Sequence, residues 1–120
     1  MNQPTLRDED LAVLRQTFRQ FPWITQVMVF GSRATGHAQR RSDIDLAIVA
    51  PSATVNQWHQ FTNAIEKAPI IHEFDLVRLD QLNNAPLLEK IEREGISIYP
   101  EILKSVGLIS PVLLEANSPR

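Results

Sequence analysis

The chain has 120 residues and a mass of 13.6 kDa, enough for one domain with a genuine hydrophobic core and too little for two. A hydrophobic fraction of 43% and a charged fraction of 22% exclude a disordered, collagen-like or coiled-coil protein. The absence of cysteine excludes disulfides, thiolate catalysis and cysteine-based zinc sites, and a net charge of −2 provides no basic field to hold a long nucleic acid.

The first half of the chain predicts a helix, a strand, a tight turn and a second strand. Asp8 is placed to cap the helix, and Pro22 to stop it. Residues 23–30 are rich in β-branched and aromatic side chains, which favours a strand. The sequence GSRATG at residues 31–36 follows directly and predicts a turn with one turn of helix, before a second strand at residues 43–50.

The second half continues the alternation of helices and strands. A helix capped by Ser52 or Thr54 precedes a third strand at residues 70–79. A last helix carries Pro86 in its first turn and leads into a short strand at residues 96–99. This order predicts an α/β (α+β) domain in which helices back one small sheet.

Two carboxylates share one face of the second strand. Side chains alternate along a strand, so Asp43 and Asp45 point to the same side, while Ile44 and Leu46 point to the other. Adjacent carboxylates repel unless a cation lies between them, and Mg²⁺ is the hard cation that prefers such oxygen ligands. Taken alone, the pair is more typical of solvated carboxylates at the end of a strand, because Asp is common at strand starts and turns.

The turn after the first strand is suited to binding an anion. Gly31 lets the backbone approach phosphate oxygens closely, and a strand that ends in Gly31 and Ser32 exposes amide groups and a hydroxyl. Gly31 and Gly36 have the outer spacing of a P-loop, but His37 and Ala38 occupy the positions that require Lys and Ser or Thr. A P-loop is therefore excluded.

A third carboxylate, Asp75, lies in the predicted third strand between large apolar residues. If that strand lies beside the second, Asp75 converges with Asp43 and Asp45. A glycine and a serine followed after ten residues by Asp-x-Asp occur by chance in roughly one chain in a thousand of this length. The combination therefore indicates a functional site more strongly than any of its parts.

These stretches, GSRATG at 31–36 through RSDIDL at 41–46 and FDLV at 74–77, resemble the signature of the polymerase β-like nucleotidyltransferases. The short chain resembles the minimal nucleotidyltransferases of that superfamily, which are often the antitoxin partners of HEPN-domain toxins. The resemblance implies a nucleotidyltransferase fold: a small mixed sheet with helices packed on one face and the active site on the other. The resemblance runs from about Leu11 to Tyr99. We expect the nucleotidyltransferase domain to span residues 1–100, and residues 101–120 to form an apolar extension that packs on the domain or on a partner.

The resemblance also implies the role of each motif residue. Gly31 and Ser32 would hold the β- and γ-phosphates of ATP, and Arg33 would reach the same triphosphate. Asp43, Asp45 and Asp75 would be the catalytic residues and the ligands of two Mg²⁺ ions, with Asp75 helping to deprotonate the attacking hydroxyl. Two such ions would stabilise the attacking and the leaving oxygen.

The resemblance implies transfer of AMP from ATP to a hydroxyl, with a tyrosine of a cognate HEPN toxin as the acceptor in a hetero-oligomeric complex. Two alternatives stay open: transfer to a small molecule such as an aminoglycoside, and a non-catalytic antitoxin that acts by steric contact. The net charge disfavours nucleic-acid polymerisation.

Other polar residues carry no such pattern. His37, His59 and His72 lack the spacing of metal ligands, and Arg40 and Arg41 make a local positive patch that suits a triphosphate, an acidic partner or simple solvation.

The N-terminal residues do not form a signal peptide. No apolar run approaches the ~20 residues that span a bilayer. We therefore expect a cytoplasmic protein without a membrane partner.

Overall fold

A computed structural model describes residues 3–101 of the chain. Residues 102–120, on which the predicted apolar extension falls, lie outside the described part. The elements are α1 (Asp8–Arg19), β1 (Gln26–Phe30), α2 (Ser32–Thr35), β2 (Ile44–Val49), α3 (Val55–Lys67), β3 (Phe74–Arg78), a 3₁₀ turn η1 (Leu79–Gln81), α4 (Ala85–Glu94) and β4 (Ile96–Tyr99).

The four strands form one mixed sheet in the order β3-β2-β1-β4. β1 pairs antiparallel with both β2 and β4, whereas β2 and β3 run parallel and are connected through α3. The predicted α/β class and mixed sheet are confirmed. The first three strands are shorter than predicted, whereas β4 has the predicted bounds. β3 starts at Phe74, where its ladder with β2 begins at the pair Ile44 and Phe74.

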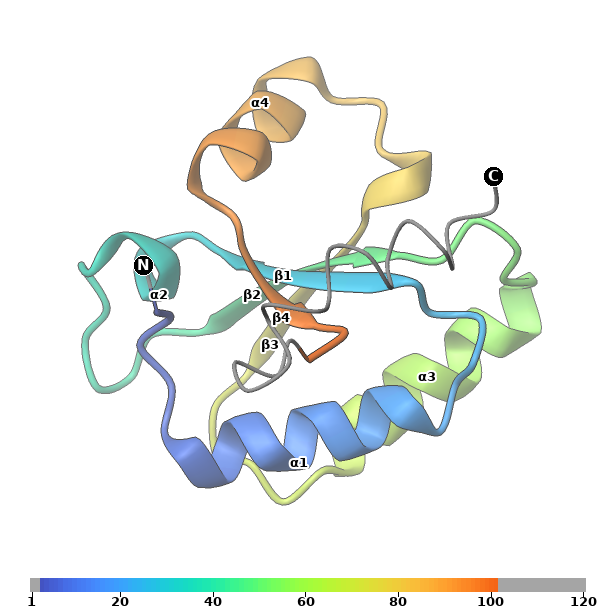
Figure 1. The fold of residues 1–120 in the computed structure, drawn as a ribbon, viewed down its shortest axis with the longest axis horizontal. Coiled ribbons are helices and arrows are strands. Elements are labelled where there is room, and N and C mark those ends of the chain that lie inside the picture. Colours follow the sequence, from blue (N-terminus) through green and yellow to red (C-terminus); the bar gives the residue numbers. More distant parts are fainter. Residues whose placement is uncertain (1–2, 102–120) are drawn as a thin grey trace, which may run out of the picture.

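Helices α1 and α3 cover one face of the sheet, and α4 lies on the other (Figure 1). The packing on the first face is mainly apolar, although α1 also buries Asp10 and Thr17. The buried apolar residues of this face come from α1, the strands and α3, and include Leu14, Phe18, Val27, Val29, Ile44, Leu46, Ile48, Phe61 and Ile65. On the second face, Ile91 of α4 packs with Phe30 and Ala47. The structure thus adds one helix to the face on which we expected only the site.

Helix α3 begins with the capping box that its sequence suggests. Thr54 Oγ1 accepts a hydrogen bond from the Gln57 amide, and the Gln57 side chain accepts one from the Thr54 amide. Helix α1 begins differently from the prediction. Arg7 occupies its N-cap position without a capping hydrogen bond from its side chain, and Asp8 is the first helical residue. There the negative charge of Asp8 still favours the helix N-terminus.

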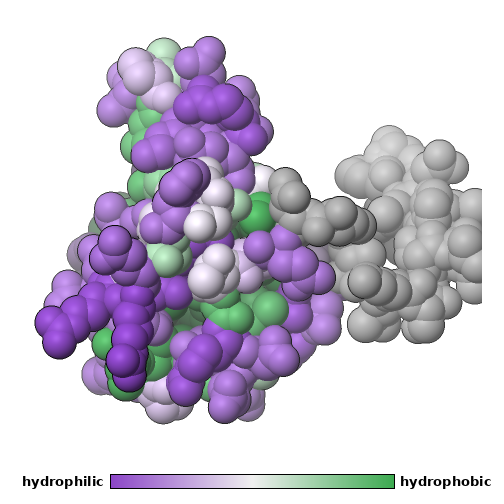
Figure 2. Space-filling view, turned by 90° about the vertical axis from the view of Figure 1, so that its left-hand side faces the viewer, coloured by the Kyte–Doolittle hydropathy of each residue, from purple (hydrophilic) through white to green (hydrophobic). Residues whose placement is uncertain are grey.

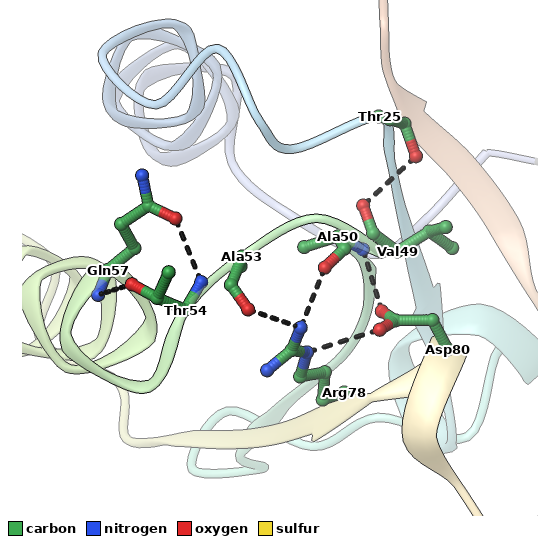
Figure 3. Close-up of polar contacts among 8 residues, drawn as sticks. All are labelled: Thr25, Val49, Ala50, Ala53, Thr54, Gln57, Arg78 and Asp80. Atoms are coloured by element: carbon green, nitrogen blue, oxygen red, sulfur yellow. Dashed lines mark hydrogen bonds and ion pairs between the residues drawn. The ribbon is translucent and has the colours of Figure 1, made fainter.

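Arg78 and Asp80 fasten the end of β2 that leads into α3 (Figure 3). Arg78 Nη2 donates to the carbonyls of Ala50 and Ala53, each at 2.9 Å, and Arg78 Nε donates to Asp80 at 3.2 Å. Asp80 in turn accepts from the Ala50 amide at 2.7 Å. The two side chains are only 11% and 13% exposed, so this ion pair is partly desolvated and well satisfied.

No helix within residues 3–101 is long and apolar enough to cross a membrane.

Candidate active site

The turn between β1 and α2 has a backbone conformation that requires glycine at its start. Gly31 has φ 76° and ψ −152°, a region that other residues rarely adopt. Its carbonyl accepts hydrogen bonds from the amides of Ala34 and Thr35, at 2.9 and 3.1 Å, which closes one helical turn. The amides of Ser32 and Arg33 start the helix, and the first amides of a helix have no acceptor within it. They are the groups that can face an anion.

Gly31 also lies directly against a carboxylate of the neighbouring strand. Asp45 in β2 pairs with Phe30, the residue before Gly31. A Cβ atom on Gly31 would overlap the Asp45 carboxylate. The glycine therefore brings the backbone of the turn into contact with the side chain of Asp45, and no larger residue fits there.

The predicted carboxylates come together on β2 and β3. Asp45 and Asp75 are register partners in the parallel ladder, so both project from the same face. Asp43 lies two residues before Asp45, just ahead of β2, and is exposed. Ile44 and Leu46 are fully buried on the other face. The alternation that the sequence predicts is thus present.

The electrostatics of Asp45 reflect this crowding. Burial raises the pKa of Asp45, and the negative charges of Asp75 and Asp43 raise it further. The positive charges of Lys90 in α4 and of Arg33 act in the opposite direction. Lys90 was not singled out from the sequence, because only the packing of α4 on the second face brings it near Asp45.

These residues fit a divalent cation by the chemistry of their donors. Three carboxylates supply the hard oxygen ligands that Mg²⁺ prefers, and a cation between them would relieve the repulsion that raises the pKa of Asp45. Within residues 3–101, no three acidic, histidine or cysteine side chains form a ready-made cation site. The carboxylates are therefore neighbours on one face and would have to turn toward a common ion.

Arg33 occupies a different place from the one the sequence suggests. It is 5% exposed, and its guanidinium donates to the carbonyl of Ser42 through Nε at 3.1 Å and Nη2 at 2.7 Å. Nη1 donates to the carbonyl of Thr5 at 2.8 Å, and Nη2 lies 3.4 Å from Nδ1 of His72. The guanidinium thus ties α2 to the segment that leads into Asp43 and is engaged within the protein, whereas the Arg33 backbone amide lies at the start of α2.

A hollow of about 620 Å³ opens beside Asp43. We call it the β3-side hollow, and its lining residues are Arg40, Arg41, Asp43, Ile71, His72 and Glu73. Figure 2 shows the side of the molecule that carries α2, where hydrophilic side chains cover most of the surface and a few hydrophobic areas lie between them. Of the three predicted carboxylates, Asp43 lines the hollow and is accessible to a second molecule there.

The comparison with family models decides the family. Residues 7–101 match the model described as polymerase beta, nucleotidyltransferase. The chain belongs to this nucleotidyltransferase family. The match spans the whole described fold from α1 to β4, including the glycine turn and the three carboxylates. None of the curated proteins is significantly similar to the chain in sequence.

Solved structures share the nucleotidyltransferase fold. A chain of a double mutant of the toxin–antitoxin MntA–HpeT matches with a TM-score of 0.61 and 17% identity, over 92% of this chain and 86% of that chain. A toxin–antitoxin structure with AMP-PNP gives a TM-score of 0.57 and 19% identity over 89% and 85%. A chain of MntA–HepT gives 0.52 and 16% over 92% and 85%. At these identities the likeness establishes the fold alone.

Proposed function

We propose that this nucleotidyltransferase is a Mg²⁺-dependent enzyme that transfers AMP from ATP to a hydroxyl group. One observation carries the proposal: Asp45 lies directly against the Gly31 turn and is the register partner of Asp75, with Asp43 two residues before it. A family member that had lost catalysis would be expected to lack one of these groups. This favours the enzyme over the steric antitoxin that the sequence left open.

Each residue has a role in this proposal. The amides of Ser32 and Arg33, together with the Ser32 hydroxyl, would bind the β- and γ-phosphates, which Gly31 lets come close. Asp43, Asp45 and Asp75 would hold the divalent metal. When bound, two such ions stabilise negative charge on the attacking and leaving oxygens.

The reaction forms a bond between the acceptor oxygen and the α-phosphorus and breaks the bond from that phosphorus to the bridging oxygen. Pyrophosphate leaves with the bridging oxygen and its electron pair. Asp75 would accept the proton of the acceptor hydroxyl, and solvent would then take it. Asp45 is the most buried of the three carboxylates, and it would be held in place by the Gly31 backbone.

The acceptor in this proposal is a tyrosine of a HEPN-domain toxin, which would make the chain an antitoxin that acts by AMPylation. Support comes from the resemblance to the minimal nucleotidyltransferases and from the fold shared with toxin–antitoxin structures, one of them with AMP-PNP. A domain of this size encloses little of an acceptor by itself, so a protein that supplies the other half of the cleft suits it. The two proteins would then form a hetero-oligomer.

Intact mass measurement tests this proposal. The chain is co-expressed with the protein encoded beside it, supplied with ATP and Mg²⁺, and both masses are recorded. We expect one or more adenylyl units on the neighbour, and none with the Asp43→Ala/Asp45→Ala variant. The exposed Asp8 in α1 provides the matched control, because Asp8→Ala should transfer normally.

The other outcomes separate the alternatives. A neighbour that co-purifies without any gain in mass would favour the steric antitoxin. Transfer by the Asp43→Ala/Asp45→Ala variant at the wild-type level would contradict the mechanism.

A further inference from the structure

The β3-side hollow lies at a defined position relative to the carboxylates. β1 ends directly before Gly31, while β2 begins after Asp43 and β3 begins after Glu73. β1 is antiparallel to β2, and β3 is parallel to β2, so these three points lie at the same end of the sheet. The strand order places β2 between β1 and β3. The Gly31 turn thus lies on the β1 side against Asp45, and the hollow opens where β2 and β3 begin, lined by Asp43 and Glu73.

This placement decides from which side an acceptor must approach, given the proposed function on which the inference rests. An in-line displacement puts the attacking and the leaving oxygen on opposite sides of the phosphorus. The leaving pyrophosphate lies at Gly31 and Ser32 in that proposal. The acceptor hydroxyl therefore comes from the β3 side, which is where the hollow opens.

The charges in the hollow favour an acidic acceptor. Arg40 and Arg41 are both exposed, and no carboxylate of residues 3–101 lies within ion-pair distance of either. Besides Asp43, which faces the metal in the proposal, Glu73 is the one carboxylate that lines the hollow. With its two arginines and two carboxylates the lining is formally neutral. Once Asp43 is committed to the metal in the proposal, the two arginines and Glu73 leave a net charge of +1, which an acidic partner can neutralise.

Ile71 gives the hollow an apolar surface. It is 87% exposed, and among the described residues it is the most exposed large hydrophobic side chain. A second hollow of about 390 Å³ shares Arg40, Ile71 and His72 and continues toward Arg7. Ile71 therefore lies at the centre of a groove that leads away from Asp43, with arginines along it.

We propose that the β3-side hollow docks the acceptor, and that the acceptor is a protein segment with an acidic and an apolar side chain close to its reacting hydroxyl. The acidic side chain pairs with Arg40 and Arg41, and the apolar one covers Ile71. A polycationic small molecule such as an aminoglycoside is disfavoured because the arginines repel it. A nucleic acid would pair with the arginines but would leave Ile71 uncovered, and the net charge of −2 does not attract it.

Charge reversal at the hollow tests the proposal on the complex with the neighbouring protein. Arg40→Glu/Arg41→Glu should slow adenylyl transfer and weaken association roughly tenfold or more at low salt, because surface charges act on association rate and its salt dependence. The difference from wild type should shrink as ionic strength rises. Ile71→Ser should weaken association at every salt concentration. Arg93→Glu, an exposed arginine on α4, is the matched control and should behave as wild type.

Nucleotide binding is the readout that separates docking from catalysis. We expect the affinity for a non-hydrolysable ATP analogue with Mg²⁺, measured by calorimetry, to stay within about twofold of wild type in the double variant. A loss of nucleotide affinity that accounts for the slower transfer would overturn the proposal and assign the arginines to the nucleotide. Wild-type transfer rates in the double variant, or transfer to RNA instead of protein, would overturn it as well.

The same experiment distinguishes this inference from the proposed function. A wild-type chain that transfers nothing, yet binds the neighbour through Arg40 and Arg41, would contradict the enzymatic proposal and support the docking surface. A double variant that modifies the neighbour as fast as wild type would support the enzymatic proposal and contradict the docking surface.

Discussion

The backbone of Gly31 lies against the carboxylate of Asp45, so that a methyl group on Gly31 would occupy the place of an Asp45 oxygen. This contact joins the two halves of the candidate site, the turn that would bind phosphate and the strand that would bind metal. The relative position of the two motifs is therefore set by a glycine as well as by the ladder between β1 and β2.

Gly31→Ala should destabilise the fold by about 3 kcal/mol and abolish transfer, because it combines an unfavourable backbone region with a displaced carboxylate. Gly36→Ala is the control: Gly36 also has a positive φ, but nothing lies within 4 Å of its added Cβ. It should cost about 1 kcal/mol and keep its activity. Denaturant unfolding and transfer assays measure both. Equal behaviour of the two variants would refute the contact.

Asp45→Asn should stabilise the chain in metal-free buffer at neutral pH. The pKa of Asp45 is raised in the folded chain, so the folded state holds more protons than the unfolded state over the interval between the two pKa values. Stability therefore falls as pH rises through that interval, and the cost remains above it. Asparagine removes the charge, and we expect a gain of about 0.5 kcal/mol, the scale of partly exposed charge interactions.

Unfolding experiments at pH 3 to 8 would check this. The wild type should lose stability relative to Asp45→Asn as pH rises. A constant difference between the two proteins would show that burial and repulsion at Asp45 do not affect folding.

Mg²⁺ together with an ATP analogue should raise the thermal midpoint of the wild type. Ligand at about 100 times its Kd stabilises the folded state by about 2.7 kcal/mol. Thermal scans of the Asp43→Ala/Asp45→Ala variant should show no such rise, and K⁺ at matched ionic strength should have no effect on either protein. A rise of equal size in the variant would place the ligand elsewhere.

Arg33→Lys should destabilise the fold by about 2 kcal/mol, since lysine cannot reach both Ser42 and Thr5 and leaves a part-buried carbonyl without its charged donor. Because Ser42 precedes Asp43, we expect kcat to fall while the KM for ATP changes little. Arg93→Lys, at an exposed position on α4, is the control. An unchanged stability with a raised KM for ATP would show that Arg33 contacts the nucleotide after all.

Local sequence patterns were sufficient to predict much of the site. The period of two along a strand placed Asp43 and Asp45 on one face, and the glycine followed by serine marked the turn. The proximity of Asp75 depended on one further assumption, that the second and third strands are neighbours, and the ladder between Asp45 and Asp75 confirms it. Spacing within a strand is local, so it is visible in the sequence.

The features of the site that could not be predicted from the sequence depend on contacts between distant segments. In the sequence, Arg33 has the pattern of an exposed turn residue. In the structure, its guanidinium is hydrogen-bonded to the carbonyls of Thr5 and Ser42, which are distant from it in the chain. Lys90 belongs to a helix whose docking face could not be chosen from its pattern. Residues 71–73 have a strand-like composition but precede the ladder, and their departure from the sheet brings Ile71 into the hollow.

Two arginines hold the central strand at opposite ends. Arg33 binds the carbonyl of Ser42 ahead of β2, and Arg78 binds the carbonyl of Ala50 just after it. A slip of β2 by one residue would turn Asp45 into the apolar core and Leu46 toward the site. Such a slip would break both sets of hydrogen bonds at once. The two arginines therefore fix the register of β2, which keeps Asp45 on the face opposite the apolar core in each folded molecule.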